Sequence, residues 1–314
     1  MSRGMLIGGG VLALVSGLTA AALAALVIVA ETPEAHVERY LAALADDDLL
    51  AAAQFAGLET GAPLPLGDEG TPTTVRVVTA QDRAENRVAV TAVYGGESDP
   101  ATVIFLLEPD ARLLGVIPQW RFVAPPVARI PVGSDNHDRV RVPGRTVTTS
   151  GPGATSEVAA FIPARVSVTN AEPFLDAPSR VIRPRSVDPA PVILQAQPSD
   201  RLVREVQRQV TELLDQCAEQ TVLQPAGCPF GRVIDDDRVL DRPRWERVDE
   251  PRVVLSRTAN AGRFSLEASA TMQITAEVQS LFDGSITRLV DDVPAEMLGV
   301  VALGPDGPVV TVYP

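Results

Sequence analysis

The chain has 314 residues, enough for two or three domains, and 46% of them are hydrophobic, which is ample for buried cores. Lysine is absent, so arginine supplies all 27 basic residues against 40 acidic ones, and the net charge is −13. An acidic chain of this kind is poorly suited to nucleic acid or an anionic lipid surface, so we expect no nucleic-acid partner.

A long apolar segment lies near the start of the chain. Residues 5–30 contain no charged residue, and about 20 apolar residues cross the hydrocarbon core as a helix. Arg3 precedes the segment and Glu31 follows it, so the positive-inside rule predicts a cytoplasmic N-terminus. We therefore predict a membrane anchor at residues 1–31, in a single-pass protein of the cell membrane with its bulk extracytoplasmic. The alternative is a cleavable signal peptide, whose apolar core is usually about 7–15 residues.

Residues 32–124 are predicted to form two helices followed by an antiparallel sheet. Thr32 is a good N-cap with Pro33 behind it, and one face of the first helix is apolar, comprising Val37, Tyr40, Leu41 and Leu44. Asp48 is expected to cap a second helix over 49–55, and Gly57 to end it. Runs of β-branched and aromatic residues then predict strands at 74–79, 87–94, 102–107 and 119–123.

The helix sequence TPEAHVERYLAALADDDLLAAAQF, followed by strands that end in PQWRF (118–122), resembles the nuclear-transport-factor-two-like, cystatin-like fold. The resemblance implies a cone-like α+β domain, of a kind common just outside the membrane in anchored actinobacterial proteins. Enzymes of this fold place Asp and His or Tyr inside the cone. Here His36 lies ahead of the apolar stripe and no acid–histidine pair is apparent, so the resemblance implies no activity.

Residues 125–197 lack a helical period and are predicted to form a small β-sandwich or β-barrel domain. Turn residues at Ser150–Gly153 separate short runs of strand-forming residues. The expected strands cover 140–142, 146–148, 157–169 and 179–182.

Residues 198–314 are predicted to form a second α+β domain. A helix over 200–219 has an apolar face composed of Val203, Val206, Val210, Leu213, Leu214 and Cys217. Strands are expected at 252–256, 263–267, 271–281, 285–290, 298–303 and 308–312. The predicted fold class of the whole chain is therefore α+β, with a transmembrane helix in front.

Two blocks of this last segment, DQCAEQTVLQPAGCPFG and EVQSLFDGSI, resemble membrane proteins of actinobacteria such as the microbacteria. A chain rich in alanine and valine and without lysine also suits a high-GC genome. The resemblance covers most of residues 199–314 and brings no activity with it.

Cys217 and Cys228 are the only cysteines, and outside the cytoplasm two such thiols are expected to form a disulfide. The alternatives are a metal pair or a redox pair. A structural metal takes four ligands and neither histidine is near in sequence, while a redox pair has Cys-x-x-Cys spacing. We predict the Cys217–Cys228 disulfide.

The remaining polar motifs favour structural interpretations. The acidic runs Asp46–Asp48 and Asp235–Asp237 lack the spacing of a calcium loop and are expected to be solvated turns. His137 lies in a polar loop and is expected to be solvated, while Trp120 and Trp245 are expected to anchor cores. We therefore predict no catalytic, cofactor or metal site.

The predicted function is a non-catalytic binding or scaffolding role in the bacterial cell envelope, held by the membrane helix. The expected partners are the membrane and another envelope protein or a cell-wall component. One alternative is a small-ligand receptor or enzyme that uses the concave face of the cystatin-like domain, and another is an accessory subunit of a membrane complex. Convergent ionisable residues in a pocket would favour the enzyme, and an exposed apolar patch would favour partner binding.

Overall fold

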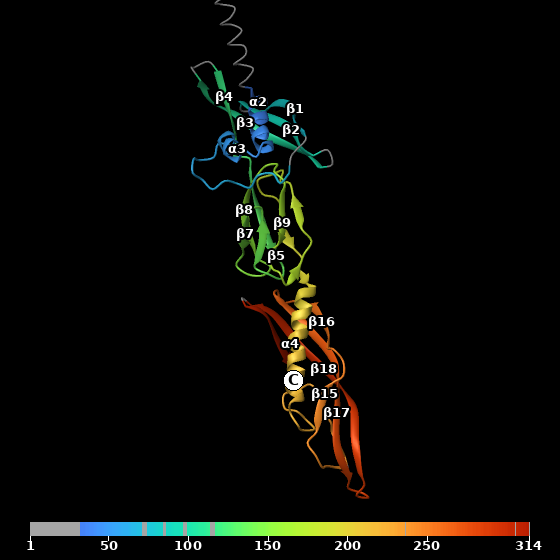
Figure 1. Ribbon diagram of the computed structural model, residues 1–314. Coiled ribbons are helices and arrows are strands. Elements are labelled where there is room, and N and C mark those ends of the chain that lie inside the picture. Colours follow the sequence, from blue (N-terminus) through green and yellow to red (C-terminus); the bar gives the residue numbers. More distant parts are fainter. Residues whose placement is uncertain are drawn as a thin grey trace, which may run out of the picture.

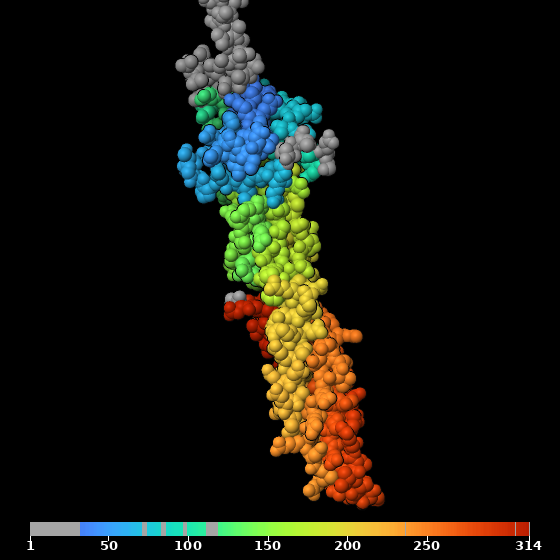
Figure 2. Space-filling model, viewed as in Figure 1, coloured from blue at the N-terminus to red at the C-terminus, as the bar shows by residue number. Residues whose placement is uncertain are grey.

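The computed structural model describes residues 32–70, 74–83, 86–96, 99–113, 117–235, 237–304 and 306–313. The chain is an elongated rod of three β-rich parts that follow one another along its length (Figures 1 and 2). We call them the N-terminal part (residues 32–122), the middle part (125–198) and the C-terminal part (199–313).

Two helices open the N-terminal part, as predicted. α2 (Pro33–Ala45) is capped by Thr32, whose hydroxyl accepts a hydrogen bond from the Ala35 N–H at 3.2 Å. α3 (Leu49–Phe55) is capped by the carboxylate of Asp48. The predicted apolar face of α2 is buried and consists of Val37, Tyr40, Leu41 and Leu44. Both helices and their caps are confirmed.

An antiparallel four-stranded sheet packs against α2 in the order β1-β2-β3-β4. The strands are β1 (Thr74–Arg83), β2 (Arg87–Gly96), β3 (Asp99–Leu113) and β4 (Ile117–Phe122). The face toward α2 is filled by aromatic rings, since Tyr40 lies 5.9 Å from Phe105 and 5.3 Å from Phe122 between ring centroids. The face that the resemblance implies to be a concave pocket is therefore packed core.

The middle part has two main sheets and a short strand pair, with no helix anywhere between residues 125 and 198. One sheet contains, in order, β11 (Arg180–Ile182), β9 (Val166–Asn170), β6 (Arg139–Val142) and β7 (Arg145–Thr148). The other contains β12 (Val192–Leu194), β5 (Val127–Ser134) and β8 (Thr155–Phe161), and the short pair is β10 (Leu175–Asp176) with β13 (Gln197–Pro198). The predicted strand over 157–169 is two strands, because the chain turns after Phe161.

The N-terminal and middle parts share one hydrophobic core that runs from Val37 to Leu194. Tyr40 of α2 bridges them, because its hydroxyl donates toward the Ile162 carbonyl at 2.7 Å and lies 3.2 Å from the Pro126 carbonyl. The loop before β1 adds a second connection, since Leu66 accepts from and donates to the backbone of β8. These contacts fix the two parts against each other.

In the C-terminal part, α4 (Asp200–Ala218) lies along one face of a six-stranded sheet (Figure 1). The sheet is built on a long hairpin of β17 (Arg263–Ser280) and β18 (Ile286–Gly304). One edge of β17 carries in succession the strands β16 (Arg252–Arg257), β15 (Arg244–Arg247) and β14 (Asp237–Val239). β19 (Gly307–Tyr313) pairs with β18 over residues 298–304.

Pro294 lies in the middle of β18, where the sequence predicts a gap between two strands. Its partner across the hairpin is Thr271, whose N–H and C=O both bond on the opposite edge of β17, to Asp249 and Val248. Thr271 and Pro294 are therefore a non-hydrogen-bonded pair, and the nitrogen of Pro294 faces away from β17. The missing N–H costs the hairpin nothing, so β18 runs through.

Polar side chains join the middle and C-terminal parts. Asp135 accepts a hydrogen bond from the Ala196 N–H at 2.9 Å and forms an ion pair with Arg257. Asn136 donates to the Ala196 carbonyl at 3.0 Å and accepts from the Gly262 N–H. A short loop after β5 thus holds both the linker before α4 and the hairpin of β16 and β17.

The predicted α+β class is wrong, because the described chain is mainly β. The prediction gave each helix equal weight with its sheet. The described helices have 13, 7 and 19 residues, whereas β17 and β18 alone have 18 and 19. Strand pairing also extends through 268–270 and 291–297, which lie between the predicted strands.

The predicted single-pass membrane location is not supported. The apolar segment on which it depends, residues 5–30, lies outside the described residues. Within the part of the chain that the structure describes, no helix combines the length and apolar character needed to cross a membrane.

Candidate binding groove in the C-terminal part

α4 is positioned by its cap and its buried face. Ser199 is the N-cap, and its hydroxyl accepts from the Leu202 N–H at 3.3 Å. The buried residues of α4 are Leu202, Val206, Val210, Leu214 and Cys217. The sequence places Val203 and Leu213 on this face, but both are only half-buried and Leu202 takes the central place. The side chain of Leu213 is therefore partly exposed at the side of α4.

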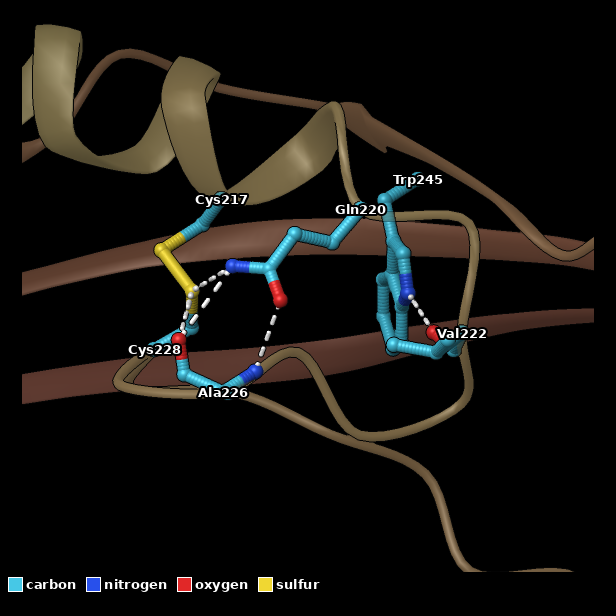
Figure 3. The surroundings of a disulfide bond; sticks show 6 residues. All are labelled: Cys217, Gln220, Val222, Ala226, Cys228 and Trp245. Carbon is cyan, nitrogen blue, oxygen red and sulfur yellow. Dashed lines mark hydrogen bonds between the residues drawn. A yellow bond between two sulfur atoms is a disulfide. The ribbon is translucent and has the colours of Figure 1, made fainter.

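The Cys217–Cys228 disulfide is present and ties the end of α4 to the loop that follows it (Figure 3). Gln220 braces the loop, because its side chain accepts from the Ala226 N–H at 2.8 Å and donates to the Ala226 carbonyl at 3.2 Å. Trp245 of β15 donates to the Val222 carbonyl at 2.8 Å. The disulfide, Gln220 and Trp245 therefore hold the loop in place together.

A groove of about 840 Å³ lies between α4, this loop and β19. Leu213 lines it from the helix, and Val310 and Val312 line it from the strand. The loop supplies the opposite wall with the segment from Gly227 to Gly231. One end is narrowed by Gln209, which donates to the Pro308 carbonyl at 3.0 Å. The groove is therefore lined by both apolar and polar groups, and its wall is positioned by the disulfide.

A second hollow, of about 600 Å³, lies on the sheet face away from α4. Register places Val254, Glu267, Leu298 and Tyr313 in one row across four strands. Val254, Leu298 and Tyr313 are about half exposed or more, at 48%, 62% and 54%. Glu296 and Tyr313 line both the groove and this hollow. The two depressions therefore meet at the point where β19 ends.

Beyond Tyr313, the outer edge of β18 has no strand partner among the described residues. β19 pairs with residues 298–304 only, whereas β18 begins at Ile286. The orientation of Pro294 shows that the main-chain groups of even-numbered residues point outward along this edge. Glu296 is the first of these after Tyr313, so its N–H and C=O lie between the groove and the hollow.

Three charged side chains on the outer face of the sheet, one each on β16, β17 and β18, have no hydrogen-bond or ion-pair partner among the described residues. They are Arg252, Glu267 and Glu296, and all line the hollow. Charged groups of this kind are open to pairing with a bound molecule.

His137 corrects the prediction of a solvated loop histidine, because its side chain is only 11% exposed. Its Nε2 lies 3.2 Å from the buried Glu172 carboxylate, and its Nδ1 accepts from the Arg139 N–H at 3.1 Å. Glu172 also accepts from Arg139 at 3.1 Å. Both ring nitrogens are occupied, so this cluster cross-links the middle part. Sequence reasoning had no signal for it, since Glu172 is 35 positions away.

The other sequence candidates have local roles. Asp46 ends α2 and Asp48 caps α3. Trp245 is buried against Phe230, with ring centroids 4.8 Å apart, and Trp120 is partly buried. In the acidic run at 235–237, position 236 is outside the described residues. Across the described residues there is no group of three or more His, Cys, Asp or Glu side chains that would hold a metal ion.

Comparisons with known proteins give little. No protein-family model and no curated protein matches the chain. A solved structure titled "Ntf2 like protein involved in plasmid conjugation" aligns with 89% of this chain and 90% of its own, at 11% identity and a TM-score of 0.14. A TM-score of this size carries no argument about fold or function, so the resemblance seen in the sequence gains only this weak likeness.

Proposed function

We propose that this protein is a non-catalytic binding or scaffolding protein that acts outside the cytoplasm and engages a partner protein through the groove of its C-terminal part. The observation that carries the proposal is the meeting of the groove and the outer hollow at a strand edge that no described strand covers. Apolar side chains and open main-chain groups together suit recognition of a polypeptide.

The shape of the molecule supports a scaffolding role. The shared core and the Asp135 and Asn136 contacts join the three parts into one rod. The C-terminal part, which contains the groove, is the part farthest from α2 (Figure 1). A partner bound in the groove would be held at a distance from the N-terminal part.

The disulfide supports the compartment. Disulfides persist in oxidising surroundings and are rare in a reducing cytoplasm. Cys217–Cys228 positions the wall of the groove, so the binding surface would depend on an oxidising environment. A protein of the cell envelope is therefore the expected partner.

The alternative of a ligand site in the N-terminal sheet is not favoured. Tyr40, Phe105 and Phe122 occupy the face toward α2, and Phe161 of the middle part lies 6.2 Å from Tyr40. The role of an accessory subunit in a larger complex is a special case of partner binding and stays a prediction.

Photo-crosslinking in the native cells tests the proposal. A photoreactive leucine analogue would replace Leu213 in the groove or, as the matched control, Leu50 on α3, which is 65% exposed. We expect a discrete protein adduct from position 213 and none from position 50. No adduct from position 213, or the same adducts from both, would overturn the proposal.

A further inference from the structure

We infer that the partner inserts an extended segment that pairs with the outer edge of β18 next to Tyr313, as an additional strand of the C-terminal sheet. This inference rests on the proposed function and names its recognition mode. The segment would have apolar side chains on one face and basic side chains on the other.

The main chain gives the first reason. The N–H and C=O of Glu296 point outward on an edge that no described strand covers. An extended backbone satisfies such groups with hydrogen bonds, as in other cases of strand addition. β19 already occupies the same edge up to Tyr313, so an added strand would continue its line.

The two depressions give the second reason. Side chains of a strand point alternately to opposite faces of its sheet. A strand on this edge would therefore place alternate side chains beside the groove, near Val312 and Leu213, and beside the outer hollow, near Tyr313. A flat edge without these depressions would offer the backbone bonds but no selection among side chains.

Charge gives the third reason. The register places Glu296 on the outer face, in a row with Ser269 and Arg252, and its carboxylate has no partner among the described residues. Opposite charges on directly opposed residues stabilise a strand pair. Acidic residues also outnumber arginines in residues 198–314. The outer-face residue opposite Glu296 is thus expected to be Arg or Lys.

Fewer charged side chains line the groove than line the hollow. Leu213, Val310 and Val312 offer apolar contacts there, and Phe230 of the loop also lines the groove. Apolar side chains of the added strand would lose their water-exposed area on this side. The pattern expected of the ligand is an alternation of apolar and basic residues over a short extended segment.

Proline substitution tests strand addition on the full chain. Glu296→Pro removes one outward N–H, and Pro294 shows that proline at such a position leaves the pairing with β17 intact. Val290→Pro is the matched control, since Val290 also faces outward but lies outside the groove and the hollow. The probe is a fluorescent synthetic peptide in which valine and arginine alternate, followed by anisotropy.

We expect wild type and Val290→Pro to bind the probe with the same Kd to within about twofold, and Glu296→Pro to bind at least about tenfold more weakly, since it loses a main-chain bond and a carboxylate. A peptide of the same sequence with alternate amides N-methylated keeps its charge but lacks the donors. We expect it to bind wild type as weakly as the unmodified peptide binds Glu296→Pro.

Equal binding of the N-methylated and unmodified peptides to wild type would overturn strand addition, whatever the variants do. Undiminished binding by a folded Glu296→Pro variant would do the same. If the adduct from position 213 persists in cells that carry Glu296→Pro, partner binding stands and only the strand mode fails. Loss of that adduct in Glu296→Pro but not in Val290→Pro is the expected result.

Discussion

Removing the Tyr40 hydroxyl tests most directly whether the N-terminal and middle parts of the rod are coupled in unfolding. Tyr40 is fully buried, and removing its hydroxyl as Tyr40→Phe leaves the ring packing in place. The Pro126 carbonyl keeps another donor, the Ile162 N–H at 2.8 Å. The Ile162 carbonyl has only the Tyr40 hydroxyl as a donor among the described residues, at 2.7 Å. The variant would therefore leave one buried acceptor unsatisfied.

An unsatisfied buried acceptor costs about 1–3 kcal/mol, so we expect the free energy of unfolding to fall by about 2 kcal/mol. Tyr94→Phe is the matched control. Tyr94 is also fully buried, and its hydroxyl makes no hydrogen bond of normal geometry among the described residues, although the Asp68 carboxylate lies near it. Removing it relieves a buried polar group, so the free energy of unfolding should change by less than about 0.5 kcal/mol, or rise.

Urea denaturation measures both variants. With a slope of about 2 kcal/mol per molar, Tyr40→Phe should lower the midpoint by roughly 1 M relative to Tyr94→Phe. Hydrogen exchange should show the loss of protection in α2 and in β8 together, because the hydroxyl joins the two parts. Equal midpoints for the two variants would refute the reasoning, and loss of protection in α2 alone would refute the coupling.

Three further predictions follow from other sites. Replacing Cys217 and Cys228 by serine should lower the free energy of unfolding by about 3 kcal/mol, given their separation of 11 residues, and calorimetry of the C-terminal transition measures it. Burial raises the pKa of Tyr40 and Tyr94 above the ordinary 10.0. Their contribution to stability is therefore present below pH 10 and lost above it. Tyrosinate absorbance of two of the three tyrosines should appear only with unfolding. Hydrogen bonds from Arg208 and then Gln209 lower the pKa of Glu205 from 4.5 to about 2, so the stability difference between wild type and Glu205→Gln should be constant above pH 4.5 and vanish as the pH falls toward 2.

Local signals explain what the sequence predicts well. Thr32, Asp48 and Ser199 cap helices because their side-chain oxygens reach N–H groups three residues on, a relation visible in the sequence. The apolar face of α2 that contains Tyr40 is buried, as the spacing of its apolar residues predicts. Cys217 and Cys228 form a pair because each is the other's only cysteine.

Long-range pairing explains what the sequence does not predict. Breaks were expected at 268–270 and 291–297, where Ala, Ser, Asp and Pro are weak strand formers. In the structure 268–270 pairs with 295–297 and 291–294 pairs with 271–274 across one hairpin, and this pairing overrides their weak local preference. The prediction of the α+β fold class is wrong for the same reason, since pairing between distant residues lengthens the strands. The candidate groove is formed by α4, the disulfide loop and two strands. No single segment of the sequence therefore predicts it. The division at 124/125 stays a prediction, although the core passes through it.

The edge of β18 is protected unevenly along its length, and this unevenness bears on recognition. Toward the hairpin tip, Arg288 and Asp292 place exposed charges on the outer face, and Pro294 removes one outward donor. Charges and proline on an edge strand discourage indiscriminate pairing with other chains. Next to Tyr313 the edge instead has full main-chain groups at Glu296 and a depression on each side. An incoming strand therefore finds one short stretch that accepts it and a longer stretch that resists it, which limits both its register and its length.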